Sequence, residues 1–247
     1  MEEGVIRYTL DLMINLYDST TGKSVEEREL SFKRDGKDYP AMYKGEGTYI
    51  FLNAGRDNSL MQISVKGFED IKLNLDYEKL DKTLPAVDVF LIPSENTAKG
   101  EALVTLKGKL TGLVSVEAVH PGRIVTTVRD MDAKRRTMTV FMPNRRMNLT
   151  QSRYALLNAE TQTFETIEVE AELSDRKIRL RSNPTEAFPA NSPICRIVYG
   201  QVEEDGSYLL RVRDDGKNLK YLVKYVVDGQ NRYKVIDFHE PDGSSLD

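Results

Sequence analysis

The chain has 247 residues, of which 40% are hydrophobic and 30% are charged, and its formal net charge is −4. This composition is typical of globular proteins and gives no reason to expect bulk attraction to nucleic acid or to anionic membranes. A single cysteine and two histidines exclude an intrachain disulfide, a zinc site built from several cysteines and a histidine-rich metal centre, so we expect no cofactor.

The N-terminus carries no secretory signal, because Glu2 and Glu3 stand where such a signal has positive charge and no long apolar run follows them. No window reaches the roughly 18 apolar residues of a membrane helix, so we expect no membrane insertion. If Met1 is the natural start, the expected location is the cytoplasm. A mature domain cut from an exported protein would begin in the same way, so a cell-surface or extracellular location stays open.

The first strand signal is a strict alternation in which Leu10, Leu12, Ile14 and Leu16 point one way. This period of two predicts a half-buried strand. The turn that follows, residues 18–23, combines side chains that bond their own backbone with a glycine free to adopt positive φ. Only residues 77–83 are compatible with a helical turn. Further strands are predicted at residues 29–33, 48–53, 60–66 and 87–92, with turns at Asp35-Gly36 and residues 45–47.

These N-terminal motifs resemble the transthyretin-like sandwich, also called the prealbumin or carboxypeptidase-regulatory-like module, over residues 7–93. Ser24-Val25 stand where this family often has a proline. The resemblance implies a spacer or adhesion module that is attached to something else and carries no catalytic residues. The motifs that carry it are Asp-x-x-Thr-Gly-Lys at residues 18–23, Gly47-x-Tyr49-x-Phe51, Ile63-x-Val65-x-Gly67-Phe68 and Val87-x-Val89-Phe90-Leu91-Ile92-Pro93.

A linker is predicted at residues 94–100, where a strand ends at Pro93 and small polar residues continue until apolar alternation resumes. The balance of acidic and basic residues also changes near this linker. Residues 1–96 hold 12 basic and 18 acidic side chains, whereas residues 97–247 hold 23 and 21. We therefore predict two domains, a sandwich over residues 1–93 and a second all-β domain over residues 101–247.

The second domain ends in a meander over residues 194–238, with hairpin turns at Asp205-Gly206, residues 214–216 and Asp228-Gly229. Residues 183–193 contain three prolines and either divide two small domains or cross between sheets of one. One domain is favoured, because about fifty residues of meander would form only a thin core. The predicted fold class is all-β, with a sandwich or a barrel in this domain. Its earlier strands are predicted at residues 102–106, 113–119, 123–128, 137–142, 152–157, 164–170 and 177–181.

The sequence contains none of the common catalytic motifs for serine hydrolases, phosphate loops, dinucleotide binding or zinc proteases. His120 precedes Pro121-Gly122 in a predicted turn, and His239 follows the last strand. A lone turn histidine is more often solvated than a general base. Cys195 lies on a strand without a partner base, so we expect a buried core thiol. The five Asp-Gly pairs stand between alternating strands, as hairpin turns do, and lack the spacing of a calcium loop.

One segment departs from this background. From Arg123 to Arg153 there are eight basic residues, two acids and four methionines. An exposed hairpin face is one interpretation. The other is a protein interface, because arginine and methionine are enriched where proteins meet. A nucleic-acid partner ranks lower, since interleaved aromatic residues are missing. The candidate interface residues are Arg129, Lys134, Arg135, Arg136, Met142, Arg145, Arg146 and Met147.

The spacing of these arginines predicts the size of the partner. If residues 137–142 form a strand, Arg135-Arg136 and Arg145-Arg146 lie at its two ends, about 20 Å apart. Both pairs then contact one partner only if it is large or repeats its acidic groups. A protein surface or another copy of this chain fits better than a small anion.

Three functions are compatible with the sequence. The first is a non-catalytic structural or interaction protein, a subunit of a larger assembly such as a phage-tail-like or surface structure, by analogy alone. The second is a carbohydrate- or cell-surface-binding module. The third is a carboxylate-based enzyme on a β scaffold, whose sign would be two close carboxylates with raised pKa. The second is suggested by the meander tyrosines, Tyr199, Tyr208, Tyr221, Tyr225 and Tyr233.

Overall fold

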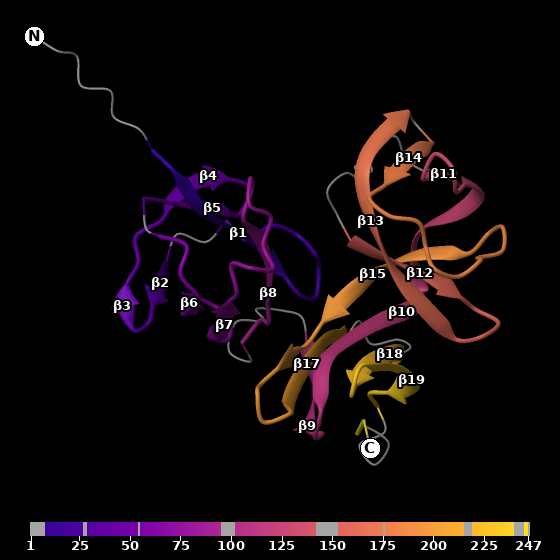
Figure 1. Ribbon diagram of the computed structural model, residues 1–247. Coiled ribbons are helices and arrows are strands. Elements are labelled where there is room, and N and C mark those ends of the chain that lie inside the picture. The colour runs from indigo at the N-terminus through magenta and orange to yellow at the C-terminus, as the bar shows by residue number, and fades with distance from the viewer. Residues whose placement is uncertain are drawn as a thin grey trace, which may run out of the picture. The chain divides into compact units, whose positions relative to one another are not determined.

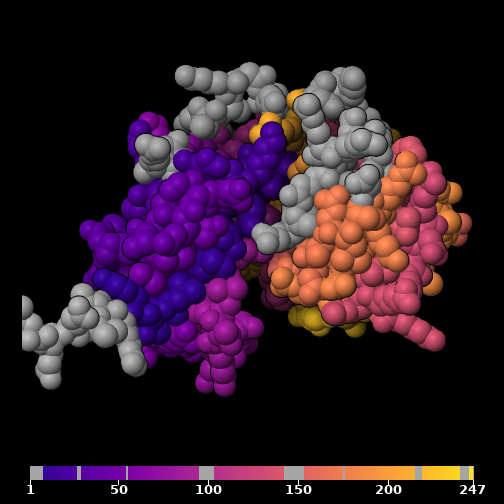
Figure 2. Space-filling model, turned by 90° about the horizontal axis from the view of Figure 1, so that it is seen from above, coloured from indigo at the N-terminus to yellow at the C-terminus, as the bar shows by residue number. Residues whose placement is uncertain are grey.

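The structure is a computed structural model that describes residues 8–26, 29–53, 55–94, 102–141, 153–174, 176–214, 219–239 and 245–246. Within these residues the chain is all-β, as the sequence predicts, and contains no helix. The chain divides into two compact units, Met1–Lys99 and Gly100–Asp247. In the space-filling view the described residues of the first unit are coloured indigo to purple and those of the second pink to yellow (Figure 2).

The first unit is a β-sandwich (Figure 1). Its described residues form β1 (Leu10–Asp18), β2 (Leu30–Arg34), β3 (Lys37–Asp38), β4 (Met42–Gly45), β5 (Thr48–Leu52), β6 (Ser59–Val65), β7 (Ile71–Leu75) and β8 (Ala86–Leu91). One sheet has the order β4-β5-β1-β8 and the other β3-β2-β6-β7. The strands β1 and β8 pair in parallel, which joins the first and last strands of the unit.

The two sheets of the sandwich share one hydrophobic core. Alternation along β1 buries Leu12, Ile14 and Leu16 completely. From the opposite sheet, Phe32 meets the Phe51 ring edge-on, with ring centroids 5.2 Å apart. Aromatic pairs in this geometry contribute beyond the area they bury, so this contact helps to hold the sheets face to face.

The predicted turns of the first unit are confirmed. The Asp18 carboxylate accepts hydrogen bonds from the backbone N–H groups of Thr20 and Thr21 at 2.7 and 3.1 Å, and Gly22 has φ +65°. Asp35 and Gly36 both have positive φ, the arrangement of a tight hairpin turn. Residues 77–83 contain turns and bends instead of a helix.

The second unit holds a longer run of strands. Its described residues form β9 (Ala102–Lys109), β10 (Leu113–Asp132), β11 (Thr137–Phe141), β12 (Arg153–Asn158), β13 (Thr163–Ser174), β14 (Lys177–Leu180), β15 (Pro193–Tyr199), β16 (Gln201–Val202), β17 (Ser207–Asp214), β18 (Lys220–Val227) and β19 (Gln230–Asp237). An eight-stranded sheet in the described residues has the order β11-β14-β13-β12-β15-β10-β18-β19.

The eight-stranded sheet closes on itself into a barrel. The strand β11 pairs with β14 on one side and with β10 on the other, so β10, β11, β14, β13, β12 and β15 form a ring (Figure 1). One interior cluster gathers buried side chains from all of these strands, among them Val128, Met138, Leu156, Val169 and Ile178. The residues between β14 and β15 therefore join two strands of the same barrel.

The long strand β10 corrects one prediction from the sequence. We expected a turn at His120, Pro121 and Gly122, but the strand continues through these residues. The pairing of β10 with β15 shifts register between Val119 and Ile124, so Pro121 lies in an irregular stretch of the ladder. A proline is tolerated at such a position because its missing N–H is not required there. The two strands predicted on either side are therefore one.

The rest of the second unit is a smaller sheet, with the order β16-β17-β9 in the described residues. Its inward side chains, such as Leu106 and Leu210, share a core with Val116 of β10 and with Tyr221 and Val223 of β18. The predicted meander is therefore wrong: β17 pairs with β16 and β9, whereas β18 pairs with β10 and β19. The strands on either side of residues 214–216 are not hairpin partners, and β10 contributes to both the barrel and this second core. Of the predicted linker, residues 94–100, only Ser94 is described, and its N–H donates to the Gly67 carbonyl at 3.0 Å.

Candidate binding surfaces

Most of the described part of the basic segment, residues 123–141, belongs to the hairpin between β10 and β11, and Arg153 begins β12. Lys134, Arg135 and Arg136 lie in the turn at residues 133–136, and all three are exposed. We call them the basic hairpin. Arg129, also exposed, lies on β10. Met142, Arg145, Arg146 and Met147 lie outside the described residues, so the predicted separation of the two arginine pairs is not tested.

Arg136 holds the basic hairpin against β14. Its backbone carbonyl accepts from the Leu180 N–H at 2.8 Å, and its guanidinium donates to the Arg181 carbonyl at 2.5 Å. The Asn183 side chain adds a hydrogen bond to the Ala133 carbonyl at 2.9 Å. Arg136 therefore has a structural role, and the base of the turn is fixed.

Lys134 and Arg135 are directed to solvent from this fixed base. Arg135 pairs with Asp132 at 3.7 Å, but the side chains are 76% and 41% exposed. An ion pair this exposed contributes little to stability. Arg129, by contrast, lies over the Phe141 ring at 5.1 Å. The outward cations of the hairpin are thus Lys134 and Arg135.

Two further arginines share one carboxylate: Arg181 and Arg153 face Glu168 at 3.2 and 4.0 Å. Arg181 is not among the predicted interface residues, because it is 45 residues from Arg136 and the pairing of β11 with β14 brings the two together.

A second surface, which sequence analysis missed, lies in the first unit. A cavity of about 650 Å³ is lined by β2, by the chain from β3 to β4, and by β5. Its walls carry the rings of Phe32, Tyr39, Tyr43 and Tyr49, together with the carboxylates of Glu26 and Asp38. We call it the tyrosine groove. One sequence feature could have suggested this groove, namely the apolar stretch Tyr39-Pro40-Ala41-Met42-Tyr43 between polar segments.

The rings of the tyrosine groove are held in place by their neighbours. Tyr39 stacks on Phe51 with ring centroids 4.6 Å apart and an interplanar angle of 11°. Tyr49 contacts Phe32 at 5.3 Å and Tyr43 at 5.1 Å. These walls are formed without a ligand, so little conformational entropy would be lost when one binds.

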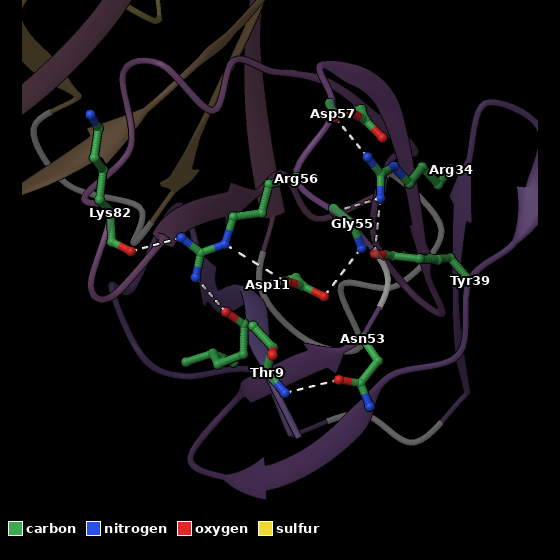
Figure 3. A network of polar contacts seen from close by, with 10 residues as sticks. Thr9, Asp11, Arg34, Tyr39, Asn53, Gly55, Arg56, Asp57 and Lys82 are labelled. Atoms are coloured by element: carbon green, nitrogen blue, oxygen red, sulfur yellow. Dashed lines mark hydrogen bonds and ion pairs between the residues drawn. The ribbon is translucent and has the colours of Figure 1, made fainter. Parts of the chain in front are cut away.

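Arg34 supports the groove from behind Tyr39 (Figure 3). Its guanidinium donates to the Tyr39 hydroxyl at 3.2 Å and to the carbonyls of Gly55 and Asp57 at 3.0 and 2.6 Å. Its Nε donates to the Ser59 hydroxyl at 2.9 Å. The same guanidinium lies 5.9 Å from the centre of the Tyr77 ring, and burial raises the pKa of Tyr77. Arg34 therefore ties the loop between β5 and β6 to the groove.

Arg56 holds the other side of this loop. It donates to the carbonyls of Leu10 and Lys82 at 2.8 and 2.7 Å, and its Nε lies 3.7 Å from the Asp11 carboxylate (Figure 3). Asp11 is only 4% exposed and also accepts from the Gly55 N–H at 3.2 Å. We call Arg34, Arg56 and Asp11 the arginine network. Because its donors satisfy backbone carbonyls, its role is structural.

The shifted pKa values of the described residues have local causes. Cys195 is fully buried, as expected of a core thiol, and this burial raises its pKa to about 12. Three carboxyl groups in the described part of the chain have lowered pKa values. The causes are hydrogen bonds from Lys79 to Asp76, from the Leu84 N–H to Asp81, and from Lys109 to Asp205. The described residues contain no cluster of three or more metal-ligating side chains.

The tyrosines that suggested carbohydrate binding belong to the packed interior. Tyr208, Tyr221 and Tyr225 are 5%, 1% and 8% exposed. The Tyr233 hydroxyl donates to the Phe164 carbonyl at 2.8 Å, and both rings pack in one cluster with Tyr199. Strand alternation turns these rings inward, so they form no exposed platform for a sugar.

Comparison with known proteins adds no relative. No protein-family model matches the chain, and no curated protein or solved structure matches it either. In the part of the chain that the structure describes, no helix has the length and apolar character needed to cross a membrane.

Proposed function

We propose that this chain is a non-catalytic protein-binding subunit of a larger assembly. The observation that carries the proposal is the basic hairpin, where Lys134 and Arg135 extend into solvent from a turn that Arg136 and Asn183 hold in place. Exposed cations that contribute little to stability but stand on a rigid support are suited to steering and orienting a partner. Phage-tail-like or surface structures are the proposed setting, by analogy alone.

We also propose that the first unit is a transthyretin-like module acting as a spacer or adhesion domain. Its support is the Asp18 turn, the two four-stranded sheets in the described residues and the parallel pairing of β1 with β8. The basic hairpin belongs to the other unit, so the proposed division of labour is a supporting sandwich and a binding barrel.

Co-purification from the native source tests the proposal. A tagged chain is recovered under gentle conditions and its mass is measured by light scattering. We expect complexes larger than the 28.1 kDa of a single chain. The variant Lys134→Glu/Arg135→Glu should lose the partner, whereas the matched control Lys72→Glu/Lys107→Glu should retain it, because both control lysines are exposed on other strands. A strict monomer that recovers no partner would contradict the proposal.

A further inference from the structure

The tyrosine groove has the chemistry of a site for a cation. The only charged side chains that line it among the described residues are Glu26 and Asp38, and the other polar groups are hydroxyls. An exposed tyrosine ring beside carboxylates suits a guanidinium or an ammonium, which can pack on the 45% exposed Tyr43 and donate to the acids. A sugar would also need strong donors, but among the described residues the groove is lined by no amide or cationic side chain.

The size of the groove points to long side chains as its occupant. At about 650 Å³ it lies in the usual range of ligand sites and has room for two extended lysine or arginine side chains. The alkyl stems of these residues cover apolar surface while their heads remain polar. Tyr43, which is 45% exposed, forms an open lip over which such stems can lie.

The chain itself presents such an occupant on its second unit. Lys134 and Arg135 are adjacent, exposed and carried by a turn whose base is held by Arg136. Charge favours the encounter, since residues 1–96 hold more acids than bases and residues 97–247 hold more bases than acids. We infer that the tyrosine groove of one copy binds the basic hairpin of a second copy of this chain. This inference rests on the proposed function and names the partner.

Such a contact joins two different surfaces, so it is not self-complementary. After a single contact forms, the copy that used its groove still has a free hairpin, and the copy that used its hairpin still has a free groove. Contacts of this type continue into closed rings or open filaments, depending on the rotation between neighbours. Assembly should therefore increase with concentration and fall with added salt, because opposite charges at the contact are screened.

Two neutralised variants test the inference by complementation. The groove variant is Glu26→Gln/Asp38→Asn and the hairpin variant is Lys134→Gln/Arg135→Gln, and all four side chains are exposed. Sedimentation velocity at low ionic strength should show wild-type species that grow beyond 28.1 kDa with concentration. Each variant alone should associate at least about tenfold more weakly. The control Lys72→Gln/Lys107→Gln should behave as the wild type does.

An equal mixture of the two variants gives the decisive result. The groove variant keeps an intact hairpin and the hairpin variant keeps an intact groove. One contact can therefore form between one copy of each, so the mixture should form dimers of twice 28.1 kDa and nothing larger. A wild-type chain that stays monomeric at every concentration, a mixture without dimers, or variants that assemble like the wild type would overturn the inference. A monomeric chain that still recovers a different protein from its native source would overturn the self-contact and leave the proposed function standing.

Discussion

Two regions of the molecule, the arginine network of the first unit and the basic hairpin of the second, use their cations differently. In the first unit, Arg34 and Arg56 turn toward the chain and donate to backbone carbonyls beside the nearly buried Asp11. In the second unit, the barrel interior is an apolar cluster, and Lys134 and Arg135 stand outside it. An arginine that satisfies backbone groups stabilises the fold, whereas an exposed cation on a rigid turn is available to a partner.

The largest loss of stability is expected when a substitution creates a cavity inside the barrel. Leu156 is fully buried in the interior cluster, so Leu156→Ala should lower the free energy of unfolding of the second unit by about 3 to 4 kcal/mol. Urea unfolding followed by circular dichroism measures this. The control Ile124→Ala removes a side chain that is 50% exposed and should cost far less. Equal losses from both variants would mean that the interior does not hold the barrel together.

The second-largest loss of unfolding free energy is expected at the arginine network. Arg34→Ala removes donors to Tyr39, Ser59, Gly55 and Asp57, and we expect the first unit to lose about 3 kcal/mol of unfolding free energy. The neighbouring Lys33→Ala is the matched control, because Lys33 is exposed. Thermal unfolding of the first unit reports the difference. If Arg34→Ala is as stable as Lys33→Ala, the network is not structural.

A smaller loss is expected at the buried carboxylate. Asp11→Asn keeps an oxygen for the Gly55 N–H but removes the charge opposite Arg56, so we expect a loss of about 1 to 2 kcal/mol. A double-mutant cycle with Arg56→Gln measures the coupling. Additive effects of the two substitutions would show that the 3.7 Å ion pair carries no energy of its own.

The sequence predicted the parts of this fold that depend on local chemistry. Asp228-Gly229 forms the predicted hairpin turn, with φ of +50° and +76°. Closure of the barrel depends on β10 pairing with β15 and on β11 pairing with β14, and such distant pairings leave no local pattern. For the same reason the tyrosine groove was missed, since Glu26, Asp38 and Tyr49 come from separate segments.

The buried thiol gives a test that depends on pH. With its pKa raised to about 12, Cys195 keeps its proton in the folded chain, whereas an unfolded thiol ionises near pH 8.5. Its contribution to stability is therefore full below about pH 8.5 and is lost as the pH rises toward 12. At pH 8 the native thiol should react with a disulfide reagent far more slowly than the urea-unfolded thiol. Equal rates would mean that Cys195 is accessible and ionised in the native state.

The smallest effect on stability, and the largest on binding, is expected at the basic hairpin. Lys134→Glu/Arg135→Glu should change the free energy of unfolding by less than about 0.5 kcal/mol, because both side chains are exposed and the ion pair with Asp132 is weak. Association should fall by more than about tenfold through lost steering and like-charge contact. The matched control Lys72→Glu/Lys107→Glu should change neither quantity.

The central claim is tested most directly by measuring association and unfolding free energy together on the Lys134→Glu/Arg135→Glu protein. The account predicts that binding to the co-purified partner or to a second copy is lost while the unfolding free energy is unchanged. A fall in stability of more than about 1.5 kcal/mol would place these cations in a structural network. Unchanged binding with unchanged stability would make the hairpin a plain solvated surface, and either result contradicts the claim.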